Sequence, residues 1–488
     1  MINNKCKVFT PKDIAENMLD EAGYIKNLYG KTFLENSCGQ GNILCLAVYR
    51  YILDCKKNNV SLDKIKMGLE NDFIGVEIDE LNYKKCIENL ESLAQSFEIY
   101  NVKWNIIKGN FLDLKINKKF DYIVGNPPYI SYADISKENR IFIRENFNSC
   151  KKGKFDYCYP FIELSLEYLN KKGKLVYLIP TNIFKNVFAN DLRSMIKSKI
   201  IKIIDYTTKK IFKNVLTSSA IVVCENKENI CQKIEYYDIK KNRKLLISKS
   251  SLGDKWIFEK NNSKKLNKVL FSDYFLASAS VATLLNEAFV IKKYDEDDKF
   301  ILVDNNKLEK KLIKKAASPR TLSKNNKELI IFPYEYTVNG LKRFDKKSFE
   351  KLYPGIANYL YEYKNKLEKR NSDKSSEWFE YGRTQALENL NQKKLLLSFI
   401  VTNKVKVYEL DENTIPYSGI YIIPKSDMTL KQAKEILESE SFFEYVKKIG
   451  ISISGTSLRI TANDIKNFDI SEWRMEKNGI TRGNCRTF

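Results

Sequence analysis

Short apolar runs alternate with longer amphipathic segments through the first half of this chain. Parallel strands need a crossover segment between them, so apolar runs separated by helices are typical of a parallel sheet. The sequence therefore predicts an α/β fold with helices on both faces of a sheet. The expected strands are 31–36, 73–78, 104–108, 122–124, 175–179, 200–206 and 219–224, and the expected helices are 41–55, 81–97 and 159–170.

The length of 488 residues favours more than one domain. Around residues 225–265 the pattern becomes polar and rich in Lys and Asn, which indicates a boundary. We expect a first domain over residues 1–250 and a second over residues 265–488. Hydrophobic residues make up 43% of the chain and aromatic residues 12%, which is enough for sizeable cores and excludes a largely disordered protein.

The sequence predicts neither a membrane-spanning helix nor a secretion signal. No apolar run reaches the roughly 18 residues of a membrane-spanning helix. The first eleven residues are polar and lack the apolar core of a signal peptide. We expect a cytoplasmic protein.

Two residue types restrict the chemistry. The sequence contains no histidine, which excludes a His general base, a catalytic triad and His-ligated metals. Its ten cysteines form no C-x-x-C pair, so we expect reduced core thiols and no structural metal site or disulfide framework. The formal net charge of +22 is compatible with a polyanionic partner, but the basic residues are mostly Lys, which together with abundant Asn and Ile also fits AT-rich coding bias.

A glycine turn follows the first expected strand. Glu35 and Ser37 precede Gly39 and Gly41, and glycines at such a turn let the backbone approach a ligand closely. The third glycine of a dinucleotide fingerprint is absent. Glu77 ends the next strand, where a carboxylate can accept hydrogen bonds from both hydroxyls of a ribose. The 36 residues from Gly41 to Glu77 exceed the roughly 20 expected, so we place an insertion at 56–72.

The most specific motif is Asn126-Pro127-Pro128-Tyr129, which follows an apolar strand. The two prolines stiffen the loop and hold the Asn126 side chain and the Pro127 carbonyl in place. Both groups are acceptors for an exocyclic NH₂ group, and an aromatic ring offers a face on which a planar substrate can stack. The motif indicates a site for a planar amine or amide substrate.

These motifs, in this order, resemble those of γ-class N6-adenine DNA methyltransferases, the type II modification methylases. The resemblance implies a Rossmann-like catalytic domain that depends on S-adenosylmethionine, followed by a mixed α/β target recognition domain. The opening Val8-Phe9-Thr10-Pro11 matches the family's first motif, and Lys108-Gly109-Asn110-Phe111 matches its adenine-binding motif, where Asn110 replaces the usual Asp. Segments 280–291, 378–383 and 454–457 resemble signatures of the recognition domain, although glycines usual in the first are absent.

The resemblance assigns a role to each matching residue. It implies that Asn126, Pro127 and Tyr129 are catalytic, with Phe212 as the second wall around a flipped adenine. The residues that it implies for the cofactor are Thr10, Glu35, Ser37, Gly39, Glu77, Ile78, Asn110, Phe111 and Asn126. It implies no metal, double-stranded DNA as partner, a separate restriction endonuclease or none, and a monomer.

Other functions share the Asn-Pro-Pro-Tyr motif. A protein glutamine methyltransferase acting on release factors, or an RNA base methyltransferase, also presents the motif to an NH₂ group. Both usually carry smaller accessory domains, whereas here more than 200 residues follow the catalytic part. A DNA-binding subunit without activity is a further alternative, which the intact motif disfavours. DNA adenine methylation is the interpretation that the sequence favours.

Overall fold

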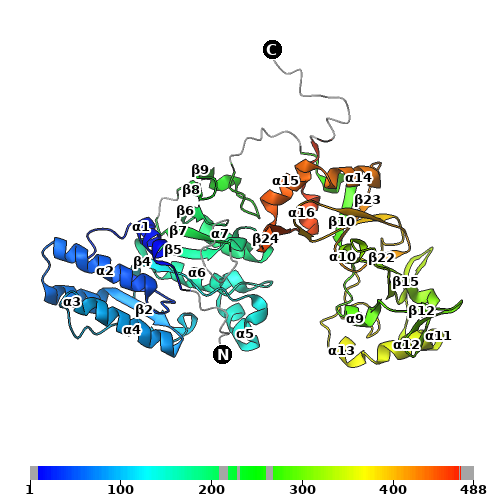
Figure 1. Ribbon diagram of the computed structural model, residues 1–488, viewed down its shortest axis with the longest axis horizontal. Helices are drawn as coiled ribbons and strands as arrows, with labels where there is room; N and C mark the ends of the chain where they lie inside the picture. Colours follow the sequence, from blue (N-terminus) through cyan, green and yellow to red (C-terminus); the bar gives the residue numbers. More distant parts are fainter. Residues whose placement is uncertain are drawn as a thin grey trace, which may run out of the picture. The chain divides into compact units, whose positions relative to one another are not determined.

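The chain forms two compact units, Met1–Asn262 and Ser263–Phe488, in a computed structural model (Figure 1). The residues described are 9–207, 218–227, 231–259, 268–454, 456–471 and 473. Among these residues, no helix combines the length and apolar character needed to cross a bilayer. Each unit has a hydrophobic core of its own, so each is described separately.

The first unit is built on a nine-stranded sheet in the order β3-β2-β1-β4-β5-β7-β6-β8-β9. Its strands are β1 (Phe33–Glu35), β2 (Phe73–Glu77), β3 (Ile106–Lys108), β4 (Phe120–Gly125), β5 (Leu169–Pro180), β6 (Ile200–Asp205), β7 (Ser219–Glu225), β8 (Lys233–Asp238) and β9 (Arg243–Ser248). The strands from β3 to β5 run parallel. β7 is antiparallel to both of its neighbours, and β9 is antiparallel to β8.

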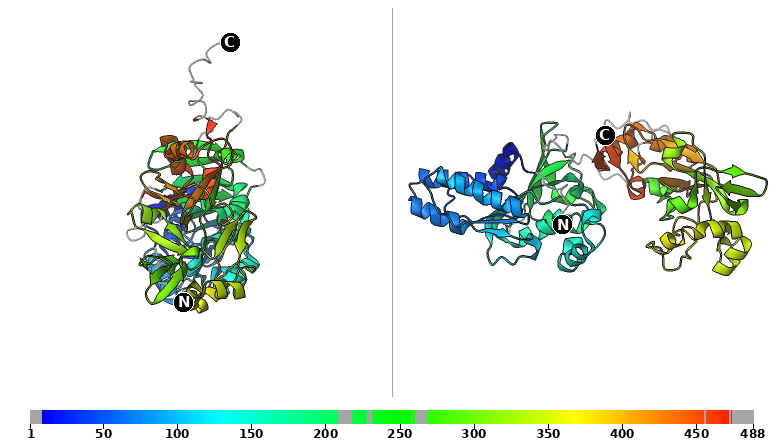
Figure 2. Two further views of the ribbon diagram at one scale, coloured as in Figure 1. Left: turned by 90° about the vertical axis from the view of Figure 1, so that its right-hand side faces the viewer. Right: turned by 60° about the horizontal axis from the view of Figure 1, so that its bottom comes forward.

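Helices cover both faces of this sheet (Figures 1 and 2). The helices are α1 (Lys12–Ala22), α2 (Asn42–Lys57), α3 (Leu62–Asp72), α4 (Glu80–Gln95), α5 (Lys137–Asn146), α6 (Cys158–Glu167) and α7 (Asn190–Lys197). Helices α1 to α4 pack into one core and α5 to α7 into the other. Successive strand residues point to opposite faces, so Ile123 of β4 enters one core and Val124 enters the other. The predicted α/β fold is confirmed.

The sheet reverses its order of winding between β1 and β4. After β1 the chain crosses to β2 and β3, then returns to place β4 on the other side of β1, with Leu34 opposite Ile123. A crevice forms outside the carboxyl ends of parallel strands at such a switch point. The glycine turn after β1 and the Asn-Pro-Pro-Tyr loop after β4 both begin at this point.

Three details differ from the sequence-based expectations. The sheet is mixed, because β7 and β9 run antiparallel to their neighbours. The polar region at 225–265 contains β8 and β9, which pair with each other and extend the sheet. The insertion at 56–72 is largely a helix, α3, which packs beside β2. Alternation of polar and apolar residues in a Lys-rich composition obscured β8 and the edge strand β9.

The second unit combines several small sheets with short helices. Its strands are β10 (Phe275–Ala279), β11 (Val290–Ile291), β12 (Asp295–Glu296), β13 (Phe300–Val303), β14 (Asn306–Glu309), β15 (Ile313–Ala317), β16 (Glu328–Ile331), β17 (Tyr334–Thr337), β18 (Gly340–Arg343), β19 (Lys394–Leu397), β20 (Ile400–Val401), β21 (Val407–Leu410), β22 (Thr414–Pro416), β23 (Ile420–Pro424), β24 (Ile451–Ser454) and β25 (Ser457–Arg459). Its helices are α8 (Phe271–Tyr274), α9 (Asn286–Phe289), α10 (Pro319–Leu322), α11 (Lys346–Leu352), α12 (Pro354–Tyr361), α13 (Lys364–Glu368), α14 (Leu430–Leu437), α15 (Glu440–Ile449) and α16 (Ala462–Lys466). This unit is mixed α/β, as predicted.

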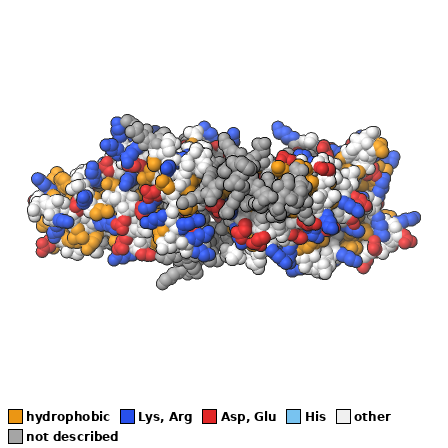
Figure 3. Space-filling view, turned by 90° about the horizontal axis from the view of Figure 1, so that it is seen from above, with side chains coloured by type: hydrophobic (Ala, Val, Ile, Leu, Met, Phe, Trp, Pro, Cys, Tyr) orange, Lys and Arg blue, Asp and Glu red, His pale blue; other side chains and the backbone are white. Residues whose placement is uncertain are grey.

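The positive charge of the chain is not gathered into one patch on the surface drawn in Figure 3, where Lys and Arg side chains lie among Asp and Glu side chains. Many of these charges form ion pairs at the surface, such as Lys315 with Asp411 at 2.9 Å. Exposed pairs of this kind contribute little to stability. Of the cysteines within the described ranges, all are free and most are buried, in agreement with the expected core thiols.

Candidate active site

The carboxyl ends of β1, β2, β3 and β4 lie next to one another, because these strands pair in parallel register. Glu35 pairs with Gly75, and Glu77 pairs with Lys108. The sequence motifs at 35–41, 77–79, 108–113 and 126–129 therefore meet at one edge of the sheet. Residues that are about 90 positions apart in the chain become hydrogen-bonded neighbours there.

The glycine turn is held from two sides. The Cys38 backbone N–H donates to the Val76 carbonyl at 2.9 Å. The Gly39 N–H donates to Glu77 Oε2 at 2.8 Å. Gly41 has a φ of 87°, and a Cβ there would lie 3.0 Å from the Cys86 sulfur, so both the conformation and the space require glycine. These contacts hold the turn in one conformation, which forms a cradle at the end of β1.

Glu77 links the turn to the end of β2. Its second oxygen, Oε1, accepts a hydrogen bond from the Asp79 N–H at 2.8 Å, and the side chain is buried. Each carboxylate oxygen can accept more than one hydrogen bond, so both remain able to accept hydroxyl groups. Ile78 beside it is 47% exposed, which leaves an apolar surface at the same edge. The Glu77 carboxylate suits the hydroxyls of a ribose, and the exposed Ile78 side chain suits a flat ring.

Glu35 lies beneath the turn and is only 3% exposed. Burial raises the pKa of its carboxyl well above the ordinary value, which a hydrogen bond from the Leu44 backbone only partly offsets. One of its oxygens, Oε2, has no hydrogen-bond partner within the described part of the chain. A cation bound nearby would lower this pKa and favour the charged carboxylate.

Asn126 is fixed at both its backbone and its side chain. The Ser37 hydroxyl donates to the Asn126 carbonyl at 3.1 Å, and Asn126 Nδ2 donates to the Thr10 hydroxyl at 3.2 Å. The other end of the amide, Oδ1, is buried without a partner among the described residues. An unsatisfied buried acceptor is uncommon and calls for a ligand donor. The amide oxygen is therefore available to an NH₂ group.

Tyr129 is anchored to the sheet. Its hydroxyl donates to the Leu178 carbonyl of β5 at 2.8 Å, and burial raises its pKa well above the ordinary value. The phenol thus stays neutral and holds the ring in a fixed orientation. This suits a stacking surface.

A second layer of polar side chains lies behind the loop. Asn36, Ser165 and Tyr177 are buried and hydrogen-bond to one another, with Asn36 Nδ2 2.8 Å from Ser165 Oγ and Ser165 Oγ 2.7 Å from the Tyr177 hydroxyl. A Cβ at Gly125 would lie 3.3 Å from the Tyr177 ring and 3.5 Å from Asn36 Oδ1. The network supports the backbone just before Asn126. Sequence reasoning missed it, because only Asn36 adjoins a motif and its partners lie more than 120 residues away.

The segment after β3 is close to the same edge. The Gly109 N–H donates to the Glu77 carbonyl at 2.9 Å. Asn110 caps a short 3₁₀ helix, accepting from the Leu112 N–H at 3.3 Å and donating to Asp113 at 2.8 Å. The Phe111 ring is buried and packs against Phe161 and Tyr168, so it forms part of the core wall there.

Asp156 lies beside the Asn-Pro-Pro-Tyr loop. The Tyr157 N–H donates to the Ile130 carbonyl at 3.0 Å, which joins this segment to the residue after Tyr129. Burial raises the pKa of Asp156 to about 6, although the Cys158 N–H donates to its carboxylate at 3.3 Å. This carboxyl group therefore titrates near neutral pH close to the predicted base pocket.

Phe212, the predicted second wall of that pocket, lies in the segment 208–217, outside the described residues. Its role remains a prediction. Val8 also falls outside the described residues, whereas Phe9 and Thr10 are described and lie against the glycine turn: the Phe9 ring is 3.3 Å from where a Cβ of Gly39 would be.

Two signatures of the second unit, about 100 residues apart in the chain, pair with each other. The N–H groups of Gly382 and Arg383 donate to the carbonyls of Thr283 and Ala282 at 3.3 and 3.1 Å. Glu380 is fully buried and pairs with Arg343. These residues hold the core of the second unit together, so their pattern in the sequence reflects packing.

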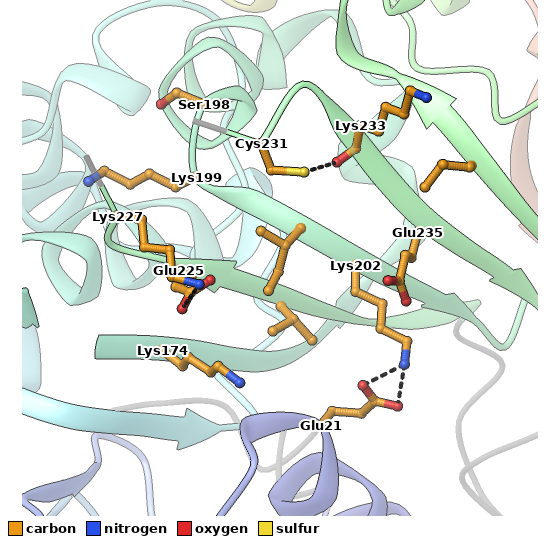
Figure 4. A pocket seen from close by; sticks show the side chains of 13 residues that line it. Glu21, Lys174, Ser198, Lys199, Lys202, Glu225, Lys227, Cys231, Lys233 and Glu235 are labelled. Atoms are coloured by element: carbon orange, nitrogen blue, oxygen red, sulfur yellow. Dashed lines mark hydrogen bonds and ion pairs between the residues drawn. The ribbon is translucent and has the colours of Figure 1, made fainter. Parts of the chain in front are cut away.

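A separate hollow of about 480 Å³ lies over β6, β7 and β8 (Figure 4). It is rich in lysine, but Lys202 pairs with Glu21 at 2.7 Å and Lys227 pairs with Glu225 at 2.6 Å. None of the motif residues lines it. In the residues that the structure covers, no cluster of three or more Cys, Asp and Glu side chains is arranged to hold a metal ion.

Comparison with known proteins places this geometry in context. A family model described as Eco57I restriction-modification methylase matches residues 48–212. The type II restriction enzyme and methyltransferase RM.Eco57I of Escherichia coli is 26% identical over 343 residues, covering 61% of this chain and 34% of that protein. The type II methyltransferase M.BstVI of Geobacillus stearothermophilus is 23% identical over 510 residues, covering 94% of this chain and 88% of that protein. The chain thus spans about a third of the first relative and most of the second.

A solved structure has a similar fold. The type IIL restriction-modification enzyme MmeI, determined in complex with DNA, matches with a TM-score of 0.58 at 15% identity, covering 93% of this chain and 64% of that one. At this identity the likeness concerns the fold of the chain. Residues 48–212 are thus similar to the Eco57I restriction-modification methylase family, and the motifs at 35–41, 77–79, 108–113 and 126–129 meet at the switch point of the sheet.

Proposed function

We propose that this protein transfers a methyl group from S-adenosylmethionine to N6 of an adenine flipped out of double-stranded DNA. The observation that carries the proposal is the unpartnered, buried Oδ1 of Asn126, next to the Pro127 carbonyl at the switch point. The glycine cradle, Glu77, exposed Ile78 and buried Glu35 fit a cofactor that has a ribose, a flat ring and a positively charged sulfonium.

In the reaction, the residues of this chain would hold and orient the cofactor and the adenine amino group. When bound, S-adenosylmethionine supplies an activated methyl group. The adenine amino nitrogen is a poor nucleophile because its lone pair is delocalised into the ring. Two acceptors, Asn126 Oδ1 and the Pro127 carbonyl, would each take one N–H and turn the lone pair away from the ring. Fixed positions and preorganised dipoles lower the barrier. The methylated nitrogen carries a positive charge and is strongly acidic, so it releases one of its protons without a dedicated base, and no histidine is required.

The target nitrogen lies inside the duplex, so the base must leave the stack, at a cost of a few kcal/mol. Tyr129 would stack on one face of the flipped base, and Phe212 on the other. The second unit would bind the duplex, with lysines on phosphates and polar side chains on base edges. RM.Eco57I joins a restriction enzyme and a methyltransferase in one protein, which supports a role for this chain in restriction-modification.

The first test is the product. Purified protein with labelled S-adenosylmethionine is expected to methylate double-stranded DNA at adenine N6, in buffer that contains a metal chelator. Digestion to nucleosides followed by mass spectrometry identifies the modified base. Label in a release factor or in RNA, with none in DNA, would contradict the proposal and favour one of the alternatives.

The second test concerns the cofactor. Glu77→Ala removes the acceptor for the ribose hydroxyls and also the anchor of the Gly39 and Asp79 N–H groups. We expect a loss of about 1.5–3 kcal/mol in S-adenosylmethionine binding, measured by calorimetry. Glu88→Ala, at an exposed carboxylate farther along the next helix, is the matched control. Asn110→Ala should cost less, because the lost hydrogen bond is neutral. Unchanged affinity in folded Glu77→Ala protein would remove Glu77 from the cofactor site.

A further inference from the structure

The amide of Asn126 can act on a substrate only if its plane is held at one angle. An Asn side chain rotates about its last torsion in a broad energy well, and a free amide would spend much of its time pointing away from the base. The backbone bond from Ser37 fixes the main chain of Asn126 but leaves this rotation free. A second contact must therefore fix the side chain.

The contact present is the Thr10 hydroxyl, 3.2 Å from Asn126 Nδ2. Thr10 is 5% exposed and is itself tied down, because its carbonyl accepts a hydrogen bond from Asn42 Nδ2 at 3.1 Å. Asn42 is the first residue of α2, directly after the glycine turn. The hydrogen bond from Asn42 thus holds Thr10, and with it the hydroxyl group, at the start of α2.

The geometry leads us to infer that Thr10 is a positioning residue for methyl transfer, which fixes the rotation of the Asn126 amide. The inference rests on the proposed function. With the amide oxygen turned to the adenine NH₂ group, the nitrogen end faces Thr10, whose hydroxyl lone pairs accept from it. Without this hydroxyl, Nδ2 is left buried without an acceptor and the amide is free to turn. Turnover is expected to fall, because a wrongly turned amide places its own NH₂ group, a donor, against the adenine NH₂ group, which is also a donor.

The test uses the full chain and compares Thr10→Val, which has the same shape without the hydroxyl, with Thr10→Ser, which keeps it. At saturating S-adenosylmethionine and DNA we expect Thr10→Val to lower turnover about five- to tenfold, the effect of losing one neutral hydrogen bond. Thr10→Ser should stay near the wild-type rate. Thr32→Val is the control. Thr32 lies just before β1, at the opposite end of this strand from the glycine turn, and its hydroxyl donates a hydrogen bond to the Asp121 carboxylate. Cofactor affinity, measured by calorimetry, should change less than turnover.

A double-mutant cycle separates this role from others. In an Asn126→Ala background, Thr10→Val should change the remaining turnover by less than about twofold, because the amide on which Thr10 acts is gone. An equal loss in both backgrounds would overturn the inference. So would a Thr10→Val protein that loses only cofactor affinity and keeps its turnover at saturation.

One readout does not depend on DNA. Selective ¹⁵N-asparagine labelling gives the side-chain amide signal of Asn126, assigned by its absence in Asn126→Ala. Thr10→Val should shift this signal and speed its hydrogen exchange, whereas Thr10→Ser should leave it in place. An unmoved signal in Thr10→Val overturns the inference. If wild-type protein fails to methylate DNA, the proposed function falls, and this measurement still decides whether Thr10 holds the amide.

Discussion

Asn126→Ala is expected to lower methylation about 10²–10³-fold, the loss seen when one preorganised hydrogen-bond partner of a developing charge is removed. In this chain Oδ1 is the buried, unpartnered acceptor at the switch point, and Pro127 alone cannot hold both N–H groups of the amine. Single-turnover methylation with labelled cofactor measures the effect. The cofactor affinity should fall far less, because the backbone contact from Ser37 to residue 126 persists.

The matched control is Asn71→Ala, an exposed asparagine on α3 whose side chain donates a hydrogen bond to the Met67 carbonyl of its own helix. It should retain the wild-type rate. Thermal unfolding of both variants checks that the fold is intact. If folded Asn126→Ala protein methylates at the wild-type rate, the amide is not the acceptor for the substrate, and the proposed chemistry is wrong.

Asp156→Asn is expected to stabilise the first unit at pH 7.5 by about 2 kcal/mol. Burial raises the pKa of this carboxyl from 3.8 to about 6, so above pH 6 the folded protein holds a charge that it disfavours. The folded state binds the proton more tightly than the unfolded state. The free energy of unfolding therefore falls as the pH rises from about 4 to about 6. That difference in pKa corresponds to about 3 kcal/mol, and partial exposure of the side chain reduces it.

Denaturant unfolding of the full chain across pH 4–8, followed by a signal from the first unit, measures this effect. The advantage of Asp156→Asn should be largest above pH 6 and shrink to little near pH 4. Asp254→Asn, which changes an exposed aspartate in the same unit, is the matched control. A constant difference between Asp156→Asn and wild type at every pH would show that the carboxyl does not titrate as described.

The sequence predicted the part of the fold in which local pattern and function coincide. The apolar runs that became β1, β2 and β4 each end at a motif, and turn chemistry placed those ends correctly. The polar alternation of β8 and β9 gave no comparable signal, because a strand with one solvated face resembles a Lys-rich loop. The short strands of the second unit are stabilised mainly by contacts distant in sequence, which a local pattern does not encode.

The candidate site likewise contains residues that local motifs predict and residues whose role depends on contacts distant in sequence. Asn126, Tyr129, Glu77 and Gly39 could be named because they stand in short motifs directly after apolar strands. Ser165 and Tyr177 could not, since their part in the site depends on a buried network that joins α6 and β5 to the end of β1. The raised pKa of Asp156 was equally invisible, because it arises from burial against residues that fold around it.

Helix α3 shows how this architecture tolerates changes in chain length. It lies in the crossover from α2 to β2, yet Glu35 and Gly75 pair in unbroken parallel register. Lengthening a connection raises its closure entropy only slowly, and α3 brings its own apolar residues, Ile65 and Leu69, into the core. A lineage can therefore gain or lose a whole helix here without moving the strand ends. Searches that fix the number of residues between the glycine turn and the acidic strand end will pass over such proteins, whereas alignment by strand register will retain them.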